Sequence, residues 1–287
     1  MVYDDVAEYF HLPQTLPVDQ RISLFRDNVL SFYSRFGRSY PWRENTSPYP
    51  VMVSEFMLQQ TQTDRVAPKF VLFLERFPDL QSLARSTLAD VLTAWQGLGY
   101  NRRARFLLES ARILVLDFSS QVPNCTDALC TLPGIGHATA SAIRAYAFDE
   151  PVVYIETNIR SVFIHHFYRE EGLSVADADL LPLVEQALDR RSPRRWYSAL
   201  MDYGTELKKR TVNPGRKSSS YIRQSPFKGS RRELRGMIIR HLLRDGRCTL
   251  PVLTASTGRE RHDVESVIRD LVVDGMVFEE KGTYCIR

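Results

Sequence analysis

Leu132-Pro133-Gly134-Ile135-Gly136 is a tight, glycine-containing turn between two stretches with helical periodicity. Both glycines permit backbone conformations and close approaches that a Cβ atom would block. Several backbone N–H groups can therefore converge on one phosphate, and the helix that follows adds the positive end of its dipole. Taken alone, this turn is better explained as an inert helix–helix connection, so its interpretation depends on the rest of the chain.

The pattern around this turn is helical from Arg21 to Tyr203. Apolar residues recur three and four positions apart, and polar residues, prolines or glycines interrupt them about every dozen residues. We therefore predict an all-α body. The predicted helices span 21–36, 51–62, 66–77, 87–98, 103–118, 138–148 and 180–189.

Helicity fails between Thr211 and Gly229, where prolines, glycines and a serine triplet cluster. Beyond this stretch, the pattern predicts helices over 231–245, 250–258 and 260–275 and a β-hairpin over 276–287 that turns at Lys281-Gly282. Three helices and a terminal hairpin are typical of a winged helix, whose third helix commonly lies in the DNA major groove. A small dimerisation or packing domain is an equally good interpretation. The predicted organisation is an N-terminal extension (1–20), a helical domain (21–210), a basic linker (211–229) and a winged-helix-like domain (230–287).

Composition and charge narrow the class of protein. Of the 287 residues, 44% are hydrophobic and 25% charged, an ordinary globular composition, and no apolar run approaches the length of about 18 residues that spans a bilayer. The first residues have no basic flank before an apolar run, so we expect no signal peptide and a cytoplasmic location. The net charge of +4 is mild, but residues 208–240 are dense in Lys and Arg with Glu233 the one acid. That block suits a polyanion such as nucleic acid, although a solvated linker is the simpler explanation of a charge run alone.

Two glutamates lie in patterned surroundings. Glu55 belongs to SEFMLQQTQ, where a helix would place Gln59 and Gln62 on its face, and Glu156 follows the apolar run 152–155 and precedes a helix. Either glutamate alone would be structural more often than not. Their arrangement relative to the glycine turn is what makes the pattern specific.

Four motifs together carry a family resemblance. Tyr40-Pro-Trp-Arg43, Ser54-Glu-Phe-Met-Leu-Gln-Gln-Thr61, Gly97-Leu-Gly-Tyr100 with its following arginines, and Leu132–Gly136 resemble the helix-hairpin-helix DNA glycosylase superfamily, and within it the MutY branch. The resemblance covers roughly residues 21–203. It implies a two-lobed helix-hairpin-helix glycosylase domain over 21–210, acting in base excision repair.

The resemblance also implies an active site. A base in a duplex is sealed by stacking, so the enzyme must extrude the nucleotide and fill the gap that it leaves. Breaking the glycosidic bond gives the sugar oxocarbenium character, which suits a protonated acid on the base and an ionised carboxylate at the sugar. Glu55 is implied as the acid, its pKa raised by burial, and Glu156 as the carboxylate facing it across the bond. The base pocket and the readers of the opposite base are implied to be Trp42, Arg43, Leu58, Gln59, Gln60, Thr61 and Asn158, with Gln59 and Gln60 as the wedge.

Three features distinguish this chain within the family. The family has an aspartate where Glu156 stands, and the extra methylene could shift the carboxylate by about one bond length. Relatives that cleave the strand carry a lysine at the position of Ala138, so we expect a monofunctional hydrolase that leaves an abasic site. We also expect the winged-helix-like domain to stand in the place of the domain with which MutY verifies 8-oxoguanine. The residues implied to contact the DNA backbone are Gly134, Gly136, His137, Thr139, Tyr100, Arg102 and Arg103.

The cysteines bear on cofactors. The family usually holds a four-cysteine iron–sulfur cluster after the stretch matching 201–204, but this chain continues TELKKRTVNPGRKSSSYIRQ. Cys125, Cys130, Cys248 and Cys285 form no CxxC pair, and we expect them to be reduced structural thiols. We therefore expect no cluster, no metal and no other cofactor.

The expected substrate is adenine mispaired with 8-oxoguanine or guanine. The expected partner is double-stranded DNA with a mispair or lesion, bound by a monomeric, nucleoid-associated protein that has no membrane contact. Two alternatives remain open. One is a glycosylase for another base, such as thymine or uracil opposite guanine or a damaged purine, and the other is a DNA-binding protein without catalysis.

Overall fold

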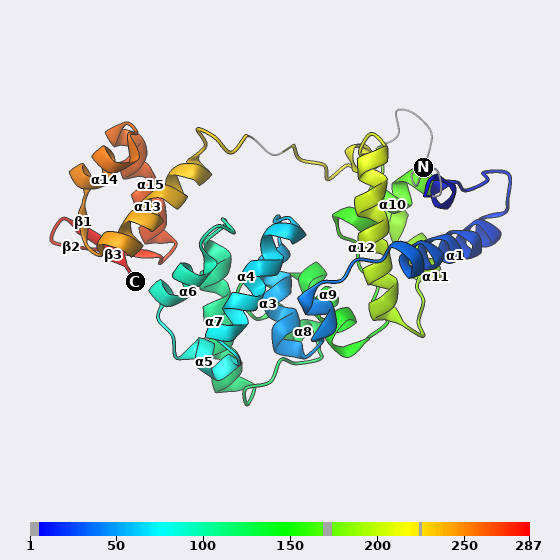
Figure 1. Ribbon diagram of the computed structural model, residues 1–287, viewed down its shortest axis with the longest axis horizontal. Helices are drawn as coiled ribbons and strands as arrows, with labels where there is room; N and C mark the ends of the chain where they lie inside the picture. Colours follow the sequence, from blue (N-terminus) through cyan, green and yellow to red (C-terminus); the bar gives the residue numbers. More distant parts are fainter. Residues whose placement is uncertain (1–5, 169–173, 224–225) are drawn as a thin grey trace. The chain divides into compact units, whose positions relative to one another are not determined.

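The computed structural model describes residues 6–168, 174–223 and 226–287, and the chain forms two compact units (Figure 1). The first unit comprises Met1–Thr46, Asn124–Thr126 and Gly136–Arg223, and the second comprises Ser47–Pro123, Asp127–Ile135 and Gln224–Arg287. Residues 1–5 of the predicted extension and 224–225 of the predicted linker lie outside the described residues. Among the described helices, none is both long and apolar enough to cross a membrane.

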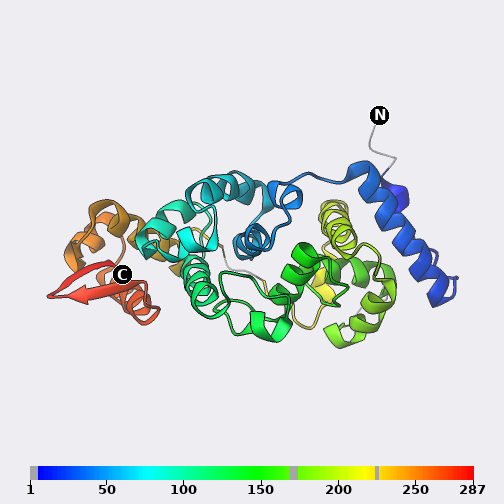
Figure 2. The same ribbon diagram turned by 90° about the horizontal axis from the view of Figure 1, so that it is seen from below.

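The first unit is built around one long helix, α12, which packs against α1 and α10. Phe25 of α1 lies against Trp196 and Tyr203 of α12, with ring centroids 6.0 and 6.4 Å apart, and against Phe163 of α10 at 5.1 Å. All four rings are fully buried, which explains why these helices form although polar residues separate their apolar positions. The elements of this unit, seen from below in Figure 2, are η1 (Ala7–Phe10), α1 (Val18–Phe36), α2 (Pro41–Glu44), α9 (His137–Phe148), α10 (Thr157–Phe167), α11 (Asp177–Ala187), α12 (Pro193–Arg210) and η2 (Pro214–Lys217).

The segment after α12 is folded onto the first unit, although its composition predicted a linker. The Asn213 carboxamide oxygen accepts the Gly215 N–H at 3.0 Å and the Ser161 hydroxyl of α10 at 3.4 Å. Val175 then pairs with this segment, donating its N–H to Lys217 O and accepting the N–H of Ser219. The first unit therefore extends through Arg223.

The second unit begins with a helical layer whose core is aromatic. Phe56, Phe70, Phe73 and Trp95 are almost fully buried. Reciprocal capping boxes begin α5 and α6, where the side chains of Asp79 and Thr87 accept backbone N–H groups. These elements are α3 (Pro48–Leu58), α4 (Thr63–Arg76), α5 (Leu80–Ala84), α6 (Leu88–Trp95), α7 (Arg102–Asp117) and α8 (Thr126–Cys130), the last of which begins at the edge of the first unit.

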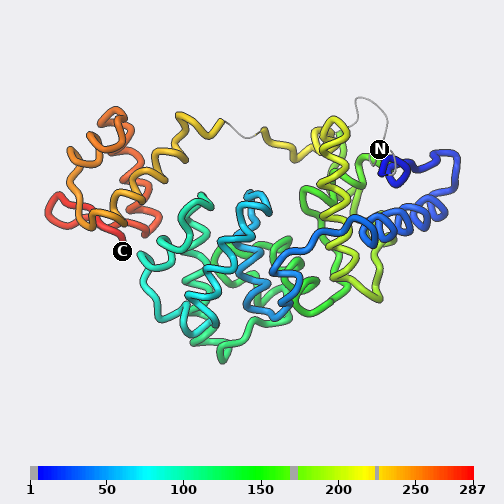
Figure 3. Tube along the Cα trace, viewed as in Figure 1, coloured from blue at the N-terminus to red at the C-terminus, as the bar shows by residue number. Residues whose placement is uncertain are grey.

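The C-terminal elements of the second unit have the predicted order of three helices and a hairpin, traced in orange and red in Figure 3. They are α13 (Arg231–Asp245), β1 (Cys248–Thr249), α14 (Leu250–Thr257), α15 (Arg261–Val273), β2 (Val277–Glu280) and β3 (Thr283–Ile286). The hairpin turns at Lys281 (φ 49°) and Gly282 (φ 76°), the two positive φ angles that a tight hairpin turn needs. Strand β1, which was not predicted, joins antiparallel to β3 in the order β1-β3-β2. The predicted helical fold class, with three helices and a hairpin at its C-terminal end, is confirmed, and the predicted domain boundaries stay predictions.

Candidate active site

Glu156 is the N-cap residue of α10. One of its carboxylate oxygens accepts the backbone N–H groups of Asn158 and Ile159, at 2.5 and 3.0 Å. Glu156 itself has an extended backbone, and its carboxylate meets the positive end of the helix dipole. This arrangement holds the carboxylate at the N-terminus of α10.

Burial raises the pKa of Glu156 above the usual range of a glutamate, against the opposing influence of the two backbone donors and of nearby Lys208 and Arg160. Lys208 lies in the last turn of α12, and burial lowers its pKa while the charge of Glu156 acts in the opposite direction. The resemblance implied an ionised Glu156. The structure shows a carboxyl whose ionised form is opposed by burial and favoured by two backbone donors and by Lys208, a partly buried lysine that sequence reasoning missed.

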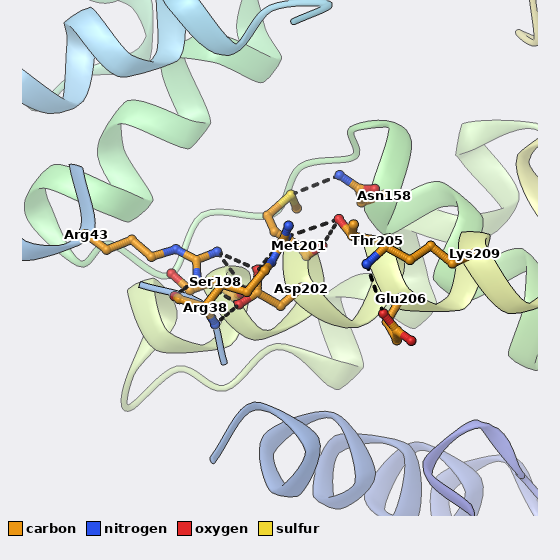
Figure 4. Close-up of polar contacts among 9 residues, drawn as sticks. All are labelled: Arg38, Arg43, Asn158, Ser198, Met201, Asp202, Thr205, Glu206 and Lys209. Carbon is orange, nitrogen blue, oxygen red and sulfur yellow. Dashed lines mark hydrogen bonds and ion pairs between the residues drawn. The ribbon is translucent and has the colours of Figure 1, made fainter. Parts of the chain in front are cut away.

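Asn158 lies in the first turn of α10 and faces α12, as Figure 4 shows. Its side-chain N–H group points to the sulfur of Met201 at 3.5 Å. Its carboxamide oxygen is buried and has no hydrogen-bond donor among the described residues. Gly204 allows the approach of the two helices, because a Cβ atom there would lie 3.0 Å from that of Asn158. The site therefore contains a buried acceptor whose hydrogen-bonding capacity is not used by the described residues.

Trp42 and Arg43 both lie on α2, and Arg43 belongs to a network of polar contacts around Asp202 (Figure 4). Trp42 stacks on Tyr40, with ring centroids 4.8 Å apart and planes at 6°. The Arg43 guanidinium donates to both carboxylate oxygens of Asp202 at 2.8 and 2.9 Å, and Arg38 donates to the same carboxylate. Asp202 is 2% exposed, so these arginines neutralise a buried charge on α12. Arg43 thereby anchors the PWR motif to α12, and its predicted place in the base pocket stays a prediction.

Glu55 lies on α3, is half-buried, and belongs to the second unit, whereas Glu156 belongs to the first. The predicted placement of the two carboxyls across a glycosidic bond therefore stays a prediction. Leu58, also half-buried, is the last residue of α3.

The prediction of one helix through Gln62 is wrong at its C-terminal end, because α3 ends at Leu58. Gln59, Gln60 and Thr61 form a turn, in which Gln60 is exposed and left-handed (φ 54°), and Gln62 immediately precedes the next helix, α4. Gln59 and Gln62 therefore do not lie on the helical face that carries Glu55. An exposed glutamine at the tip of a turn is, however, a suitable shape for a wedge.

The physical reason for this helix end is Arg103, which is 7% exposed. Its guanidinium donates to the last-turn carbonyls of Phe56 and Met57 at 2.7 and 2.8 Å and to the Thr61 hydroxyl at 2.9 Å. It therefore replaces the intrahelical donors that α3 would need to continue. Burial lowers the pKa of Arg103 to about 10, which still leaves it charged at neutral pH. This burial disfavours the phosphate contact predicted for Arg103 and gives the residue a structural role.

The loop from Gly97 to Tyr100 is held by the same arginine. Gly97 (φ 92°), Gly99 (φ 71°) and Tyr100 (φ 48°) all have left-handed backbones. Arg103 donates to Gly99 O at 3.3 Å and lies over the Tyr100 ring, 5.2 Å from its centroid, and Trp95 also donates to Gly99 O at 3.1 Å. One buried guanidinium therefore connects the glutamine turn to the Gly97–Tyr100 loop.

The glycine turn packs on α3 and α7. Gly134 has φ 79°, and a Cβ atom there would lie 2.8 Å from the Phe106 ring and 3.0 Å from that of Phe56. Its carbonyl accepts a hydrogen bond from the side-chain N–H of Gln59 at 3.4 Å, and the Pro133 carbonyl accepts one from the Ser110 hydroxyl at 3.1 Å. Glycine is required at this position for both its φ angle and its contacts.

Helix α9 begins after Gly136 in the first unit. No side chain caps its N-terminus, and Gly136 and His137 are exposed while Thr139 is half-buried. The first-turn N–H groups are therefore placed as an anion site requires. Of the remaining predicted backbone contacts, Arg102 has a 54% exposed side chain and pairs with Asp274 at 2.6 Å.

The residues after α12 do not fit an iron–sulfur cluster. Such a cluster needs four converging thiolates, and residues 205–223 contain no cysteine. Cys248 and Cys285 lie buried in the C-terminal sheet of the second unit, whereas Cys125 precedes α8 and Cys130 is its last residue. In the described part of the chain, no group of three or more His, Cys, Asp or Glu residues could hold a metal ion.

Comparison with known proteins places the chain in a family. The model of the HhH-GPD superfamily base excision DNA repair proteins matches residues 53–181. The chain is 32% identical over 284 residues to the adenine DNA glycosylase of Mycolicibacterium smegmatis, covering 87% of this chain and 91% of that protein. It is 37% identical over 183 residues to that of Mycobacterium tuberculosis H37Rv, covering 63% of this chain and 60% of that protein.

A solved thermostable thymine-DNA glycosylase superposes with a TM-score of 0.58 at 22% identity, covering 65% of this chain and 87% of that one, which shows a shared fold. The sequence match extends over nearly the whole of the M. smegmatis protein. The chain therefore belongs to the HhH-GPD superfamily of base excision DNA repair proteins, and within it to the adenine DNA glycosylase family.

Proposed function

We propose that this protein is a monofunctional adenine DNA glycosylase that acts on double-stranded DNA containing adenine opposite 8-oxoguanine or guanine. The observation that carries the proposal is the match to the M. smegmatis adenine DNA glycosylase over 91% of that protein. Residues 21–210 are the proposed catalytic domain and 230–287 the winged-helix-like domain. The protein acts as a monomer on nucleoid DNA.

The proposed chemistry uses the two glutamates in different roles. Glu55 donates a proton to a ring nitrogen of the flipped adenine, and the bond between that base and C1′ of the sugar breaks. The ionised Glu156 stabilises the positive charge that develops at C1′, and a water molecule adds there and loses a proton. Adenine and an abasic site are the products. Lys208 supports this step, because its charge favours the ionised form of Glu156.

Asn158 supports binding at the sugar. Its buried, unpartnered carboxamide oxygen lies two residues after Glu156 and is suited to accept a hydrogen bond from the attacking water. The contact would strengthen once the nucleotide is in place, because the acceptor has already lost its hydration.

The proposed DNA contacts come from exposed turns. Gln60 enters the stack, with Gln59 behind it and Trp42, Arg43, Leu58 and Thr61 around the base pocket. Gly134, Gly136, His137 and Thr139 bind one phosphate through the glycine turn and the α9 N-terminus, and Tyr100 and Arg102 bind along the same strand. Ala138 offers no amine to attack the sugar, so we propose that the enzyme does not cleave the strand.

Incubation with duplexes that each carry one mispair or lesion, followed by alkali, tests the activity. We expect alkali-dependent breaks with adenine opposite 8-oxoguanine or guanine, lost in Glu55→Gln. Product only from duplexes with thymine or uracil opposite guanine would assign a different base. Duplex binding with no product from any substrate would indicate a protein without catalysis, and breaks without alkali would contradict the role of Ala138.

We also propose that the protein works without an iron–sulfur cluster, because the residues after α12 lack thiolates and are folded onto α10 through Asn213 instead. Iron and sulfide analysis of protein purified without oxygen tests this proposal, together with its visible absorption spectrum. Stoichiometric iron and sulfide would overturn it.

A further inference from the structure

The C-terminal elements of the second unit contact the loop that contains Tyr100. Arg232, in the first turn of α13, donates to the Tyr100 hydroxyl at 2.6 Å, and its guanidinium carbon lies 5.7 Å from the ring centroid. The hydroxyl and the ring are thus both engaged by one arginine that is distant in sequence.

A second contact joins three elements through one carboxylate. The carboxylate of Asp274, which follows α15, forms ion pairs with the guanidinium groups of Arg102 of α7 and Arg235 of α13. Each N···O distance is 2.6 Å. The Asp274 side chain is only 11% exposed. Its burial would raise the carboxyl pKa, but its bonds to the two arginines lower it overall, so this link is charged at neutral pH.

The loop itself needs external support. Tyr100 is a bulky residue in a left-handed conformation, which is strained and persists only where surrounding contacts impose it. Arg103 supplies contacts from the interior of the unit and Arg232 supplies them from the C-terminal elements. The orientation of Tyr100 therefore depends on both.

Helix α15 is a poor candidate for direct reading of DNA. Its exposed side chains include Asp263 and Glu265, which would repel phosphates, beside Arg261 and Arg269. Asp270 pairs with Arg231 inside the C-terminal elements, and the end of α15 leads into Asp274. The contacts of Arg232 and Asp274 connect this domain to the loop, and the exposed side chains of α15 form no basic face.

We infer that the C-terminal domain is a support for the DNA-binding loop, in which Arg232 and Asp274 are positioning residues that hold Tyr100 and Arg102 for contact with the duplex. The inference rests on the proposed function, because it takes the loop to bind DNA. Arg232 acts through the Tyr100 hydroxyl and not on the phosphates.

A double-mutant cycle tests the inference. Arg232→Gln, Tyr100→Phe and the double variant are compared for dissociation constant on an adenine–8-oxoguanine duplex at several salt concentrations. We expect each single substitution to weaken binding about two- to tenfold, the range for one hydrogen bond. The double variant should bind no more weakly than the single variant with the lower affinity. The salt dependence of Arg232→Gln should equal that of the wild type. Arg232→Lys, which can still donate, should recover part of the loss.

Arg231→Gln is the matched control, because Arg231 is the neighbouring arginine on α13 but pairs with Asp270 at 2.6 Å. We expect its affinity to stay near that of the wild type. Asp274→Asn should weaken binding, since it removes the charge that holds Arg102 and Arg235. Thermal unfolding of every variant reveals any general loss of structure. Such a loss would not reproduce the expected salt dependence or the expected result of the double-mutant cycle.

Multiplicative effects in the double variant, with a salt slope lowered by about one, would show Arg232 on a phosphate and overturn the inference. Unchanged binding in Arg232→Gln would also overturn it. Either result is distinguishable from failure of the proposed function, which would appear as a wild-type protein that releases no adenine from any duplex.

Discussion

Removal of the Arg103 guanidinium should destabilise the second unit severely while leaving its apolar packing nearly intact. In Arg103→Met, a side chain of similar length replaces the guanidinium, so the buried carbonyls of Phe56 and Met57 lose their donors at 2.7 and 2.8 Å. Each buried carbonyl without a donor costs about 1–3 kcal/mol, which gives about 2–6 kcal/mol for the pair. That is a large part of the total of about 5–15 kcal/mol typical of a native protein. Arg103→Lys keeps one donor in reach and should lose roughly half as much.

Urea unfolding followed by tryptophan fluorescence measures this loss, with Arg112→Met as the matched control. Arg112 is on the same helix and also donates to two backbone carbonyls, those of Ala84 and Ser86 at 3.2 and 2.9 Å, but it is exposed. Water can replace its hydrogen bonds, so we expect a cost below about 1 kcal/mol. Equal losses in the two variants would refute the reasoning. The reasoning would also be refuted if Arg103→Met had normal stability and the salt dependence of its DNA binding corresponded to about one phosphate contact fewer. That result is the signature of a direct contact to the DNA backbone.

Four further perturbations have defined outcomes. Because burial raises the pKa of Glu156 and only its ionised form stabilises the sugar, the single-turnover rate should climb as pH rises through that raised pKa, and Lys208→Gln should move the midpoint of the pH profile to higher pH. A pKa that is raised in the folded state also means that the ionised form of Glu156 destabilises the fold at neutral pH. Glu156→Gln should therefore be inactive but have a higher melting temperature at pH 7, and this gain should disappear in acid. A lower melting temperature at pH 7 would contradict the argument. Gly134→Ala should cost about 2–5 kcal/mol in urea unfolding, from its φ of 79° and the nearby rings, whereas Gly136→Ala, with no heavy atom within 4 Å, should be close to neutral. Asn213→Ala should lose about 0.5–2 kcal/mol of unfolding free energy, as for other side chains that cap a helical turn, and an unchanged value would show that the segment after α12 is not anchored there.

Local features of the sequence predicted local features of the structure. The Lys281-Gly282 pair predicted the hairpin turn because few residues adopt two successive positive φ angles. The apolar run before Glu156 and the helical pattern after it predicted where α10 begins. In both places the information lies within a few residues, so a short window of sequence is sufficient.

Features that depend on distant partners could not be predicted. The helix over 51–62 stops early because Arg103, more than forty residues away, takes the carbonyls of its last turn. An arginine after a GLGY motif looks the same in sequence whether it faces solvent or the interior, which is why Arg102 and Arg103 received the same predicted role. Lys208 and Asp274 were missed for a related reason, because each acquires its role only from the residues that the fold brings beside it.

A single helix, α7, organises the turns that the family resemblance assigns to DNA in the second unit. Arg103 holds the glutamine turn and the Gly97–Tyr100 loop, Phe106 fits against Gly134, and Ser110 bonds the carbonyl of Pro133. These three positions are three and four residues apart, so they lie along one face of the helix. The backbone strain of the turns is therefore supported by a rigid element and not by the loops themselves. Substitutions on this face should alter several DNA contacts together, whereas substitutions in one turn should alter only its own, and the Arg232 contact to Tyr100 extends the same support to the C-terminal domain.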